Sequence, residues 1–373
     1  KRISKENRKI TNEIEKKRNR KNIPESEYIT TMKNPENVVE FDNVHTYFFT
    51  DIGTVKAVDG VSFEIPQGKT VGVVGESGCG KSVTSLSLMQ LVQRPQGQTV
   101  EGEIRFNTGD KVYNIVNTPT SEMQKLRGNE LSMIFQEPMT SLNPVFTIGN
   151  QLKEAIELHT DRKGKVAMDR AIEMLTLVGV NEPEKRVKQY PYELSGGMRQ
   201  RVMIAMALAC EPDILIADEP TTALDVTIQA QILELMQSLQ KKLGMAIIMV
   251  THDLGVIADM CDEIIVMYGG RVCERGTAED IFYRPAHEYT KGLLKSIPSV
   301  DRMGEKLIPI PGTPINLLNM PKGCAFCPRC ENAMKICIEE VPPEIQMPDG
   351  HFASCWMSVK EQMEAQQEGK NNE

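Results

Sequence analysis

The strongest structural signal in the chain is the octapeptide Gly75-Glu76-Ser77-Gly78-Cys79-Gly80-Lys81-Ser82. The apolar run Val71–Val74 precedes it, and residues Val83–Leu91 follow with a helix-forming composition. A strand, a glycine-rich turn and a helix with the spacing G-x4-G-K-S make the Walker A pattern. Glycines let the backbone curl into a nest of N–H donors for phosphate oxygens, and the helix adds its positive N-terminal end. The sequence therefore predicts an α/β fold with a loop that binds nucleotide phosphates.

The two polar residues that close this loop have separate predicted roles. Lys81 places a positive charge on the outer phosphates, and the Ser82 hydroxyl is free to ligate Mg²⁺. We expect ATP and Mg²⁺ as cofactors. The residues of this loop assigned to the nucleotide are Gly75, Glu76, Ser77, Gly78, Cys79, Gly80, Lys81, Ser82 and Val83.

Composition limits the remaining possibilities. The 373 residues suffice for one α/β domain and a smaller unit, and the formal net charge of −8 argues against a nucleic-acid partner. No apolar run approaches the 18 residues that a membrane-spanning helix needs, and no apolar segment follows the basic start, so we expect neither a membrane span nor a signal peptide. Residues 1–36 hold ten Lys and Arg against three Glu in their first 21 positions. This arm is expected to be mobile or an exposed helix, either simply solvated or attracted to anionic lipid.

Polar residues end three predicted core strands. Gln136 follows Leu131–Phe135, Asp218-Glu219 follows Ile214–Ala217, and His252 follows Met245–Val250. Open α/β sheets place ligands at the carboxyl ends of their strands. Asp218 would hold Mg²⁺ and Glu219 would polarise the attacking water, whereas an isolated Asp-Glu pair is usually a solvated edge. His252 would reach a γ-phosphate or make a local backbone contact.

A helical insertion is predicted over residues 145–210. Its last helix begins at Leu194-Ser195-Gly196-Gly197, where Ser195 can cap the helix and the glycines expose its first N–H groups. By itself this is either a second anion-binding helix start or an ordinary capped helix. A further helix follows Ala223-Leu224-Asp225.

Taken together, these motifs resemble, in their order, those of ATP-binding cassette (ABC) ATPases over about Val38–Tyr283. The segments Phe135–Pro144, Leu194–Gln200 and Pro285–Thr290 are similar to those of the ATPase subunits of oligopeptide and dipeptide permeases. The resemblance implies a cassette of the P-loop NTPase fold over residues 37–285 and a small cysteine-rich domain over 286–373. It also implies that Gln136 senses the nucleotide and joins Ser82 and Asp218 at Mg²⁺, and that Lys81, Gln136, Glu219 and His252 carry out hydrolysis.

The same resemblance implies a mechanism shared between two chains. Each ATP would lie between the Walker motifs of one cassette and the signature residues of its partner, here Leu194, Ser195, Gly196, Gly197 and Asp225. Expected partners are a second, non-identical cassette, two membrane permease subunits and an extracellular solute-binding protein, which places the chain at the cytoplasmic face of a bacterial membrane. The predicted function is ATP-driven import of peptides. A nickel or other small-solute importer and a soluble, non-transport ABC ATPase are the alternatives.

An aromatic residue in the predicted strand before Val55–Val58 is expected to stack on adenine. The residues themselves leave two interpretations open, since aromatic side chains at positions 47–49 also suit the core of a sheet. By resemblance, Phe48 matches the adenine-stacking position best, and Tyr47 is the second choice.

Five of the nine cysteines lie between Cys324 and Cys355. Their spacing is compatible with an iron–sulfur cluster, a zinc ion or free thiols. The resemblance implies a [4Fe–4S] cluster on Cys324, Cys330, Cys337 and Cys355, with zinc as the alternative and Cys327 as a bystander. Because this segment follows the last cassette motif, we expect it to lie outside the cassette and to leave the chemistry at Lys81 and Glu219 unaffected.

Overall fold

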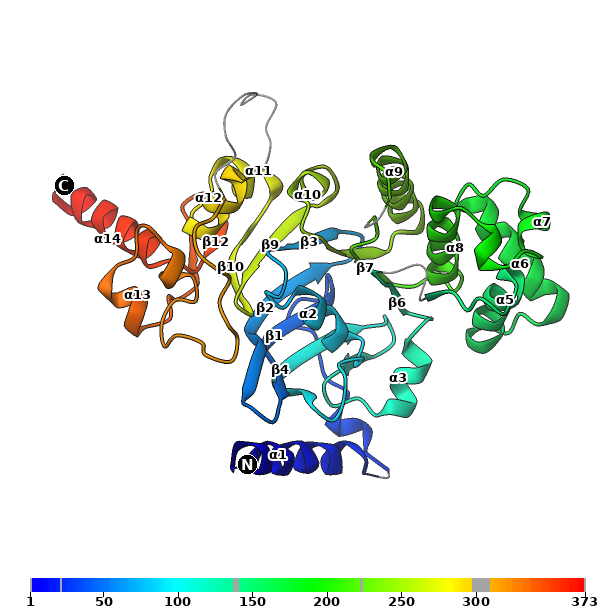
Figure 1. Ribbon diagram of the computed structural model, residues 1–373, viewed down its shortest axis with the longest axis horizontal. Coiled ribbons are helices and arrows are strands. Elements are labelled where there is room, and N and C mark those ends of the chain that lie inside the picture. The colour runs from blue at the N-terminus through cyan, green and yellow to red at the C-terminus, as the bar shows by residue number, and fades with distance from the viewer. Residues whose placement is uncertain (1, 21, 137–140, 222–223, 297–308, 372–373) are drawn as a thin grey trace.

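The computed structural model of the chain describes residues 2–20, 22–136, 141–221, 224–296 and 309–371. Two sheets form its centre (Figure 1). The larger sheet has the strand order β11-β12-β10-β9-β3-β8-β7-β6, and the smaller has the order β2-β1-β4-β5. The strands of the larger sheet are β3 (Thr70–Val74), β6 (Leu131–Ile134), β7 (Ile214–Asp218), β8 (Ala246–Val250), β9 (Glu263–Tyr268), β10 (Arg271–Gly276), β11 (Ile345–Gln346) and β12 (Phe352–Ala353).

The larger sheet is buried on both faces. Its strands β9, β3, β8, β7 and β6 run parallel, and β10 turns back antiparallel to β9. Along β7, Ile214 and Ile216 pack into the core shared with the smaller sheet, whereas Leu215 and Ala217 pack into the core on the other face. Parallel sheets need both faces covered, which explains the nearly unbroken apolar runs in these strands. The predicted α/β fold is confirmed.

The smaller sheet is antiparallel. Its strands are β1 (Asn37–Phe49), β2 (Thr54–Pro66), β4 (Gly97–Asn107) and β5 (Val112–Asn114). Residues 38–49 read as two short runs in the sequence but form one continuous strand. The break between the runs is an irregularity in register between Phe41 and Val44, at which Asn43 takes a positive φ of 49°. Such a bulge bends a strand without ending it.

The larger sheet is flanked by helices α2 (Lys81–Leu88), α3 (Thr120–Leu126), α9 (Val226–Leu243) and α10 (Leu254–Met260). A second group of helices stands at one end of the molecule, shown in green in Figure 1. Its members are α5 (Ile148–His159), α6 (Gly164–Leu177), α7 (Pro183–Arg186) and α8 (Gly196–Leu208). They fill the range predicted as a helical insertion, and their apolar residues join those of β7 and β8 in one core.

The basic N-terminal arm forms a helix, α1 (Arg2–Arg18), that lies against the smaller sheet (Figure 1). Asn7 is buried there and donates from Nδ2 to the Thr50 carbonyl oxygen at 2.8 Å. The helix is therefore docked on the smaller sheet. Within the described ranges, no helix combines the length and the apolar character needed to cross a bilayer.

The C-terminal segment is built into the cassette. Strand β12 pairs with β10, and β11 pairs with β12, so that residues near position 350 extend the larger sheet. Helices α11 (Ala278–Tyr283), α12 (Glu288–Lys295), α13 (Lys335–Glu339) and α14 (Trp356–Asn371) surround this edge. The expectation that the cysteine-containing segment lies outside the cassette is therefore wrong, because strand pairing connects it directly to the sheet.

Candidate active site

The octapeptide 75–82 joins β3 to α2 and rests on the backbone of its neighbours. Gly80 has a φ of +106°, and a Cβ there would lie 2.3 Å from the Ala57 carbonyl oxygen. A Cβ at Gly75 would lie 2.2 Å from the Met267 carbonyl oxygen. Any side chain at these two positions would displace β2 or β9. Glycine is therefore required both by the conformation of the loop and by the close approach of its neighbours.

Lys81 is buried and directed back at its own loop. Its Nζ donates to the carbonyl oxygens of Gly75 at 2.7 Å and of Glu76 at 3.1 Å. The ammonium group therefore closes the loop into a ring and stands where the outer phosphates of a nucleotide are expected.

Ser82 and Asp218 meet across the gap between α2 and β7. The Ser82 hydroxyl donates to Asp218 Oδ1 at 3.1 Å. Asp218 is buried, and burial raises its pKa while the hydrogen bond from Ser82 opposes that rise. Two oxygen ligands at the phosphate loop suit Mg²⁺, which prefers carboxylate and hydroxyl oxygens together with the substrate's phosphates. Because Asp218 is buried, it is not the solvated carboxylate at a strand edge that an isolated Asp-Glu pair usually forms.

Glu219, directly after β7, contacts side chains that follow the ends of β6 and β8. Its Oε2 accepts a hydrogen bond from Gln136 Nε2 at 2.9 Å, and its Oε1 lies 3.2 Å from His252 Nδ1. Its backbone has a φ of +47°, which is strained for a residue with a side chain, and its N–H donates to the Val250 carbonyl oxygen. Strain of this kind persists only where the surroundings enforce it, and it concentrates at active sites. Gln136, Glu219 and His252, chosen from separate strand ends in the sequence, thus form one cluster.

The Leu194–Gly197 segment begins a helix in the second group. Ser195 caps α8 by accepting from the Met198 N–H, while Ser195 and Gly196 are exposed and Leu194 is buried. Figure 1 places α8 among the green helices and α2 over the sheets. Asp225 caps α9 through the Ile228 N–H at 3.0 Å, and Ala223 lies outside the described residues. The helix start is therefore open to a molecule approaching from outside.

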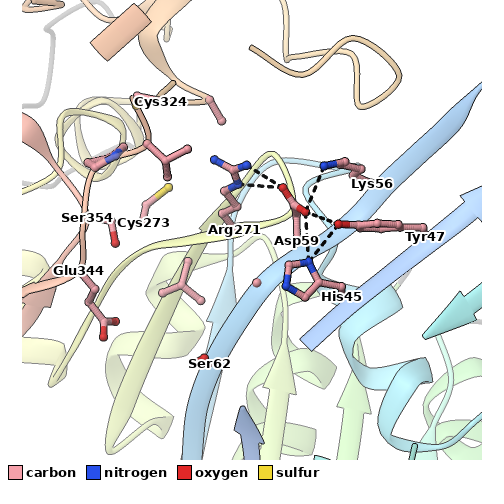
Figure 2. Close-up of a pocket in the computed structure, with 15 residues that line it drawn as sticks. His45, Tyr47, Lys56, Asp59, Ser62, Arg271, Cys273, Cys324, Glu344 and Ser354 are labelled. Atoms are coloured by element: carbon pink, nitrogen blue, oxygen red, sulfur yellow. Dashed lines mark hydrogen bonds and ion pairs between the residues drawn. The ribbon is translucent and has the colours of Figure 1, made fainter. Parts of the chain in front are cut away.

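Tyr47 belongs to a charged cluster around Asp59 (Figure 2). Its hydroxyl donates to Asp59 Oδ1 at 2.6 Å, and Arg271 Nη2 donates to Oδ2 at 2.7 Å. Burial alone would raise the pKa of Asp59, but the hydrogen bonds from Tyr47 and Arg271 lower it to about 2. The cavity beside this cluster, of about 490 Å³, also reaches Cys273 and Cys324. The Tyr47 hydroxyl thus completes an ion-pair network.

Phe48 lies in a different environment from Tyr47. Thr46, two residues before Phe48, contacts Ser87 of α2 through its hydroxyl at 2.8 Å. The Phe48 ring packs over Gly97, where a Cβ would lie 2.9 Å from its Cε1, and it lines a cavity shared with α1. Of the two predicted adenine-stacking residues, Phe48 is the one whose ring takes no part in the Asp59 network.

The cysteines of the C-terminal segment gather around α13 and the start of α14. The Cys324 N–H donates to the Cys337 carbonyl oxygen at 2.8 Å. Burial and the neighbouring thiols of Cys337 and Cys355 raise the pKa of Cys324 to about 11, and burial with Glu288 and the same two thiols does so for Cys330. Burial, and then the neighbouring Cys337, raise the pKa of Cys327. None of the nine cysteines, all within the described ranges, forms a disulfide in the structure.

Sequence reasoning missed a contact between this cysteine segment and the phosphate loop. Arg329 binds the Glu76 carboxylate with both ends of its guanidinium, at 2.6 and 3.1 Å. No local pattern marks this pair, because its members are 253 residues apart. This contact joins the segment to the phosphate loop, and the expectation that the segment leaves the chemistry at Lys81 and Glu219 unaffected stays a prediction.

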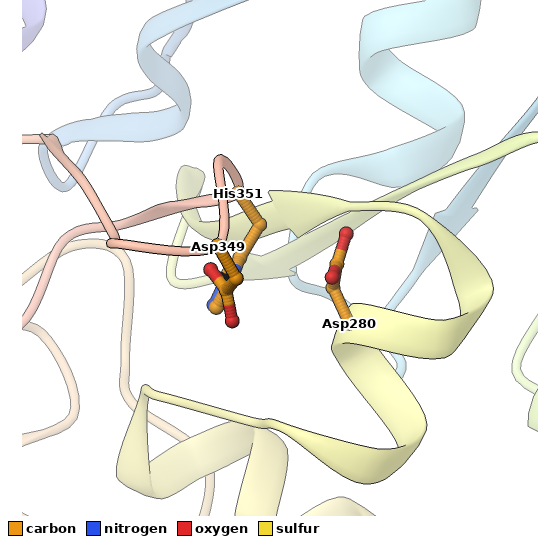
Figure 3. Close-up of side chains that lie close together, drawn as sticks. All are labelled: Asp280, Asp349 and His351. Carbon is orange, nitrogen blue, oxygen red and sulfur yellow. Dashed lines mark hydrogen bonds and ion pairs between the residues drawn. The ribbon is translucent and has the colours of Figure 1, made fainter.

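A group of possible metal ligands, Asp280, Asp349 and His351, lies near β12 (Figure 3). Arg284 forms ion pairs with the carboxylates of Asp280 and Asp349, and its Nε lies 3.2 Å from Asp349 Oδ2. Asp280 also forms a capping box with Thr277 at the start of α11. His351 Nδ1 lies 2.5 Å from Asp349 Oδ1. A cation is thus already supplied by the chain, and the group fastens the C-terminal loop to α11.

Comparison with known proteins agrees with this geometry. The sequence profile described as ABC transporter matches residues 58–222, and the profile described as oligopeptide/dipeptide transporter, C-terminal region, matches residues 273–337. The fold is similar to the dimeric structure of the ATP-binding cassette MJ0796 in a post-hydrolysis state with ADP and phosphate. The TM-score is 0.57 at 28% identity, and the match covers 64% of this chain and 98% of that one.

Fold and site together define an ATP-binding cassette ATPase. The dipeptide transport ATP-binding protein DppD of Bacillus subtilis is 51% identical over 322 residues, which are 86% of this chain and 95% of that protein. The oligopeptide transport ATP-binding protein OppD of Salmonella typhimurium is 48% identical over 90% of this chain and 98% of its own length. Within the ABC ATPases, the chain belongs to the oligopeptide/dipeptide transport ATP-binding family.

Proposed function

We propose that this chain is the ATP-hydrolysing subunit of an importer of oligopeptides or dipeptides at the cytoplasmic face of the cell membrane. It works with a second, non-identical cassette, two membrane permease subunits and an extracellular solute-binding protein. The observation that carries the proposal is the 51% identity with a dipeptide transport protein, nearly end to end, together with the cluster at Glu219. The peptide-transport names of the relatives favour peptides over nickel.

At the site, each residue acts on a different part of the reaction. The loop N–H groups and Lys81 would hold the phosphates, while Ser82, Asp218 and Gln136 would hold Mg²⁺, which would supply neutralisation of developing charge. Glu219 orients and polarises the attacking water. His252 and Gln136 fix the Glu219 carboxylate from both sides, at 3.2 and 2.9 Å. We assign His252 to contact with the γ-phosphate as well.

The direct test is reconstitution of the chain with its partner cassette and permease subunits in lipid vesicles. We expect ATP hydrolysis to rise severalfold when the solute-binding protein is loaded with a dipeptide or oligopeptide. Nickel ions in place of peptide are the control and should give no rise. Stimulation by nickel alone would assign the chain to the small-solute alternative.

An apolar surface beside Gln136 supports docking to a permease. Phe135, Val145 and Phe146 are 42, 70 and 50% exposed. Residues 137–140, which belong to the same motif, lie outside the described part of the chain. Exposed apolar side chains within about ten residues of a nucleotide-sensing residue in the sequence suit a cytoplasmic helix of the membrane subunit, which would couple the nucleotide to the pore.

The exposed start of α8 supports a role at the partner's nucleotide. One nucleotide needs one phosphate-binding helix start, and this chain has two, at Lys81 and at Gly196. We assign Leu194, Ser195, Gly196, Gly197 and Asp225 to the ATP held by the second cassette.

Replacement of Ser195 by Arg tests this assignment. A bulky cation would fill the helix start, so hydrolysis at the partner's nucleotide should fall at least tenfold while labelling of this chain by a photoreactive ATP analogue persists. Labelling resolved chain by chain gives the answer. Loss of labelling on this chain alone would contradict the shared arrangement.

We assign the adenine-stacking role to Phe48. Its ring lies on the strand that contacts α2 through Thr46, and Tyr47 is occupied by Asp59. An aromatic ring there would add stacking energy of about 1 kcal/mol to nucleotide binding.

The four cysteines Cys324, Cys330, Cys337 and Cys355 are assigned to a [4Fe–4S] cluster. Thiolates are the ligands of such clusters, and Cys324 and Cys330 are each electrostatic neighbours of both Cys337 and Cys355. A zinc ion on the same thiols is the alternative.

A further inference from the structure

Arg329 reaches from the cysteine turn into the phosphate loop. It ends the short 3-10 helix Cys327–Arg329, directly before Cys330. Its Nη1 lies 2.6 Å from Glu76 Oε2, and its Nη2 lies 3.1 Å from Oε1. Glu76 is the second residue of the loop that closes around the phosphates. Two parallel N–H···O bonds fix both the charge and the plane of this carboxylate.

The guanidinium is itself held rigidly. Its Nε donates to the Pro311 carbonyl oxygen at 2.8 Å, and the side chain is only 4% exposed. The guanidinium carbon lies 5.7 Å from the centre of the Tyr268 ring and 5.9 Å from that of Phe326. A cation held this way meets little solvent screening and loses little freedom when it binds its partner.

The backbone of Glu76 is fixed from the same side. Its N–H donates to the hydroxyl of Tyr289, a buried residue of α12, at 2.8 Å. The Tyr289 ring packs against Tyr268, with centres 4.6 Å apart, and against Phe326 at 5.4 Å. This aromatic cluster joins β9, α12 and the cysteine turn into one support beneath the loop.

Glu76 would oppose nucleotide binding if it were left unpaired. Its carboxylate belongs to the loop that receives a triphosphate, and its carbonyl oxygen accepts from Lys81 Nζ at 3.1 Å. An uncompensated negative charge there would repel the phosphates and compete for Lys81. We propose that Arg329 is a positioning residue for nucleotide binding, which neutralises Glu76 and holds the phosphate loop in its binding form.

The test compares Arg329→Gln with Arg329→Lys in the full chain. We expect Arg329→Gln to weaken the affinity for a fluorescent ATP analogue about tenfold. In the assembled transporter it should raise the KM for ATP by a similar factor and change kcat less than twofold. Arg329→Lys should recover part of the affinity, because it keeps the charge and loses the fork. Arg275→Gln is the matched control, since Arg275 joins the same two parts of the chain through Glu344, away from the loop.

A double-variant cycle separates positioning from general stability. In a Glu76→Gln background no carboxylate needs neutralising, so adding Arg329→Gln should change the affinity by less than threefold. The Glu76→Gln chain retains Arg329 and every residue of the cysteine turn. It replaces Arg329→Gln as the chain that breaks the Arg329–Glu76 pair if Arg329→Gln folds poorly. Three results would each overturn the proposal: unchanged affinity in Arg329→Gln, an equal loss in Arg275→Gln, or a full tenfold loss on adding Arg329→Gln to Glu76→Gln.

Discussion

Replacement of Glu219 by Gln is expected to lower ATP hydrolysis between about a hundredfold and ten-thousandfold, the range that a positioned general base contributes. The amide cannot take a proton from water, whereas the carboxylate that lies between Gln136 and His252 can. ATP binding should remain within a few fold of the original, because we assign the phosphate contacts to the loop and Lys81. The complex should then accumulate with ATP enclosed between its two cassettes.

Lys81→Ala is the contrasting variant. Lys81 contacts its own loop where we expect the outer phosphates, so its loss should weaken nucleotide binding itself. Equilibrium binding of a fluorescent ATP analogue and phosphate release, measured on both variants, separate the two roles. Equal loss of binding in Glu219→Gln and Lys81→Ala would show that the roles are wrongly assigned.

Loss of any one of the four assigned cysteines should remove the metal and loosen the C-terminal segment. These thiols come from a 32-residue stretch that has little apolar core of its own, and metal sites of this size supply folding free energy on the order of 10 kcal/mol. We expect the largest effect from Cys337→Ser, because Cys337 is buried and lies near other thiols of the segment. Since Arg329 lies between Cys327 and Cys330, weaker nucleotide binding should accompany the loss of metal.

Cys327→Ser is the matched control and should keep the metal. Iron, acid-labile sulfide and zinc are assayed after anaerobic purification, and limited proteolysis reports the state of the segment. Stoichiometric zinc without iron would replace the proposed cluster by a zinc site. Loss of metal in Cys327→Ser would change the ligand set.

Much of the active site was predictable because its geometry is local or follows from strand order. The phosphate loop depends on glycines a few residues apart. Asp218 ends β7, and Gln136, Glu219 and His252 follow the ends of β6, β7 and β8 by one or two residues. Neighbouring parallel strands bring their carboxyl ends to one edge of the sheet. The periodicity of the apolar residues is enough to predict those strands.

The C-terminal segment was predicted least well. Its cysteines are visible in the sequence, but strands β11 and β12 are only two residues long each and carry no periodic signal. The pairing of β12 with β10, to which β11 is added through β12, depends on where the chain returns after long loops. For that reason the sequence suggested a separate unit, and the structure has an extension of the cassette's sheet.

The spacing of residues 75–82 by itself determined that this protein closes a phosphate loop, because a nest of N–H groups forms within one turn of backbone. Tertiary structure alone decided which of Tyr47 and Phe48 joins Asp59, and that Arg329 meets Glu76. Both outcomes depend on side chains from remote segments arriving at one place, and only the packing of the whole chain fixes such encounters.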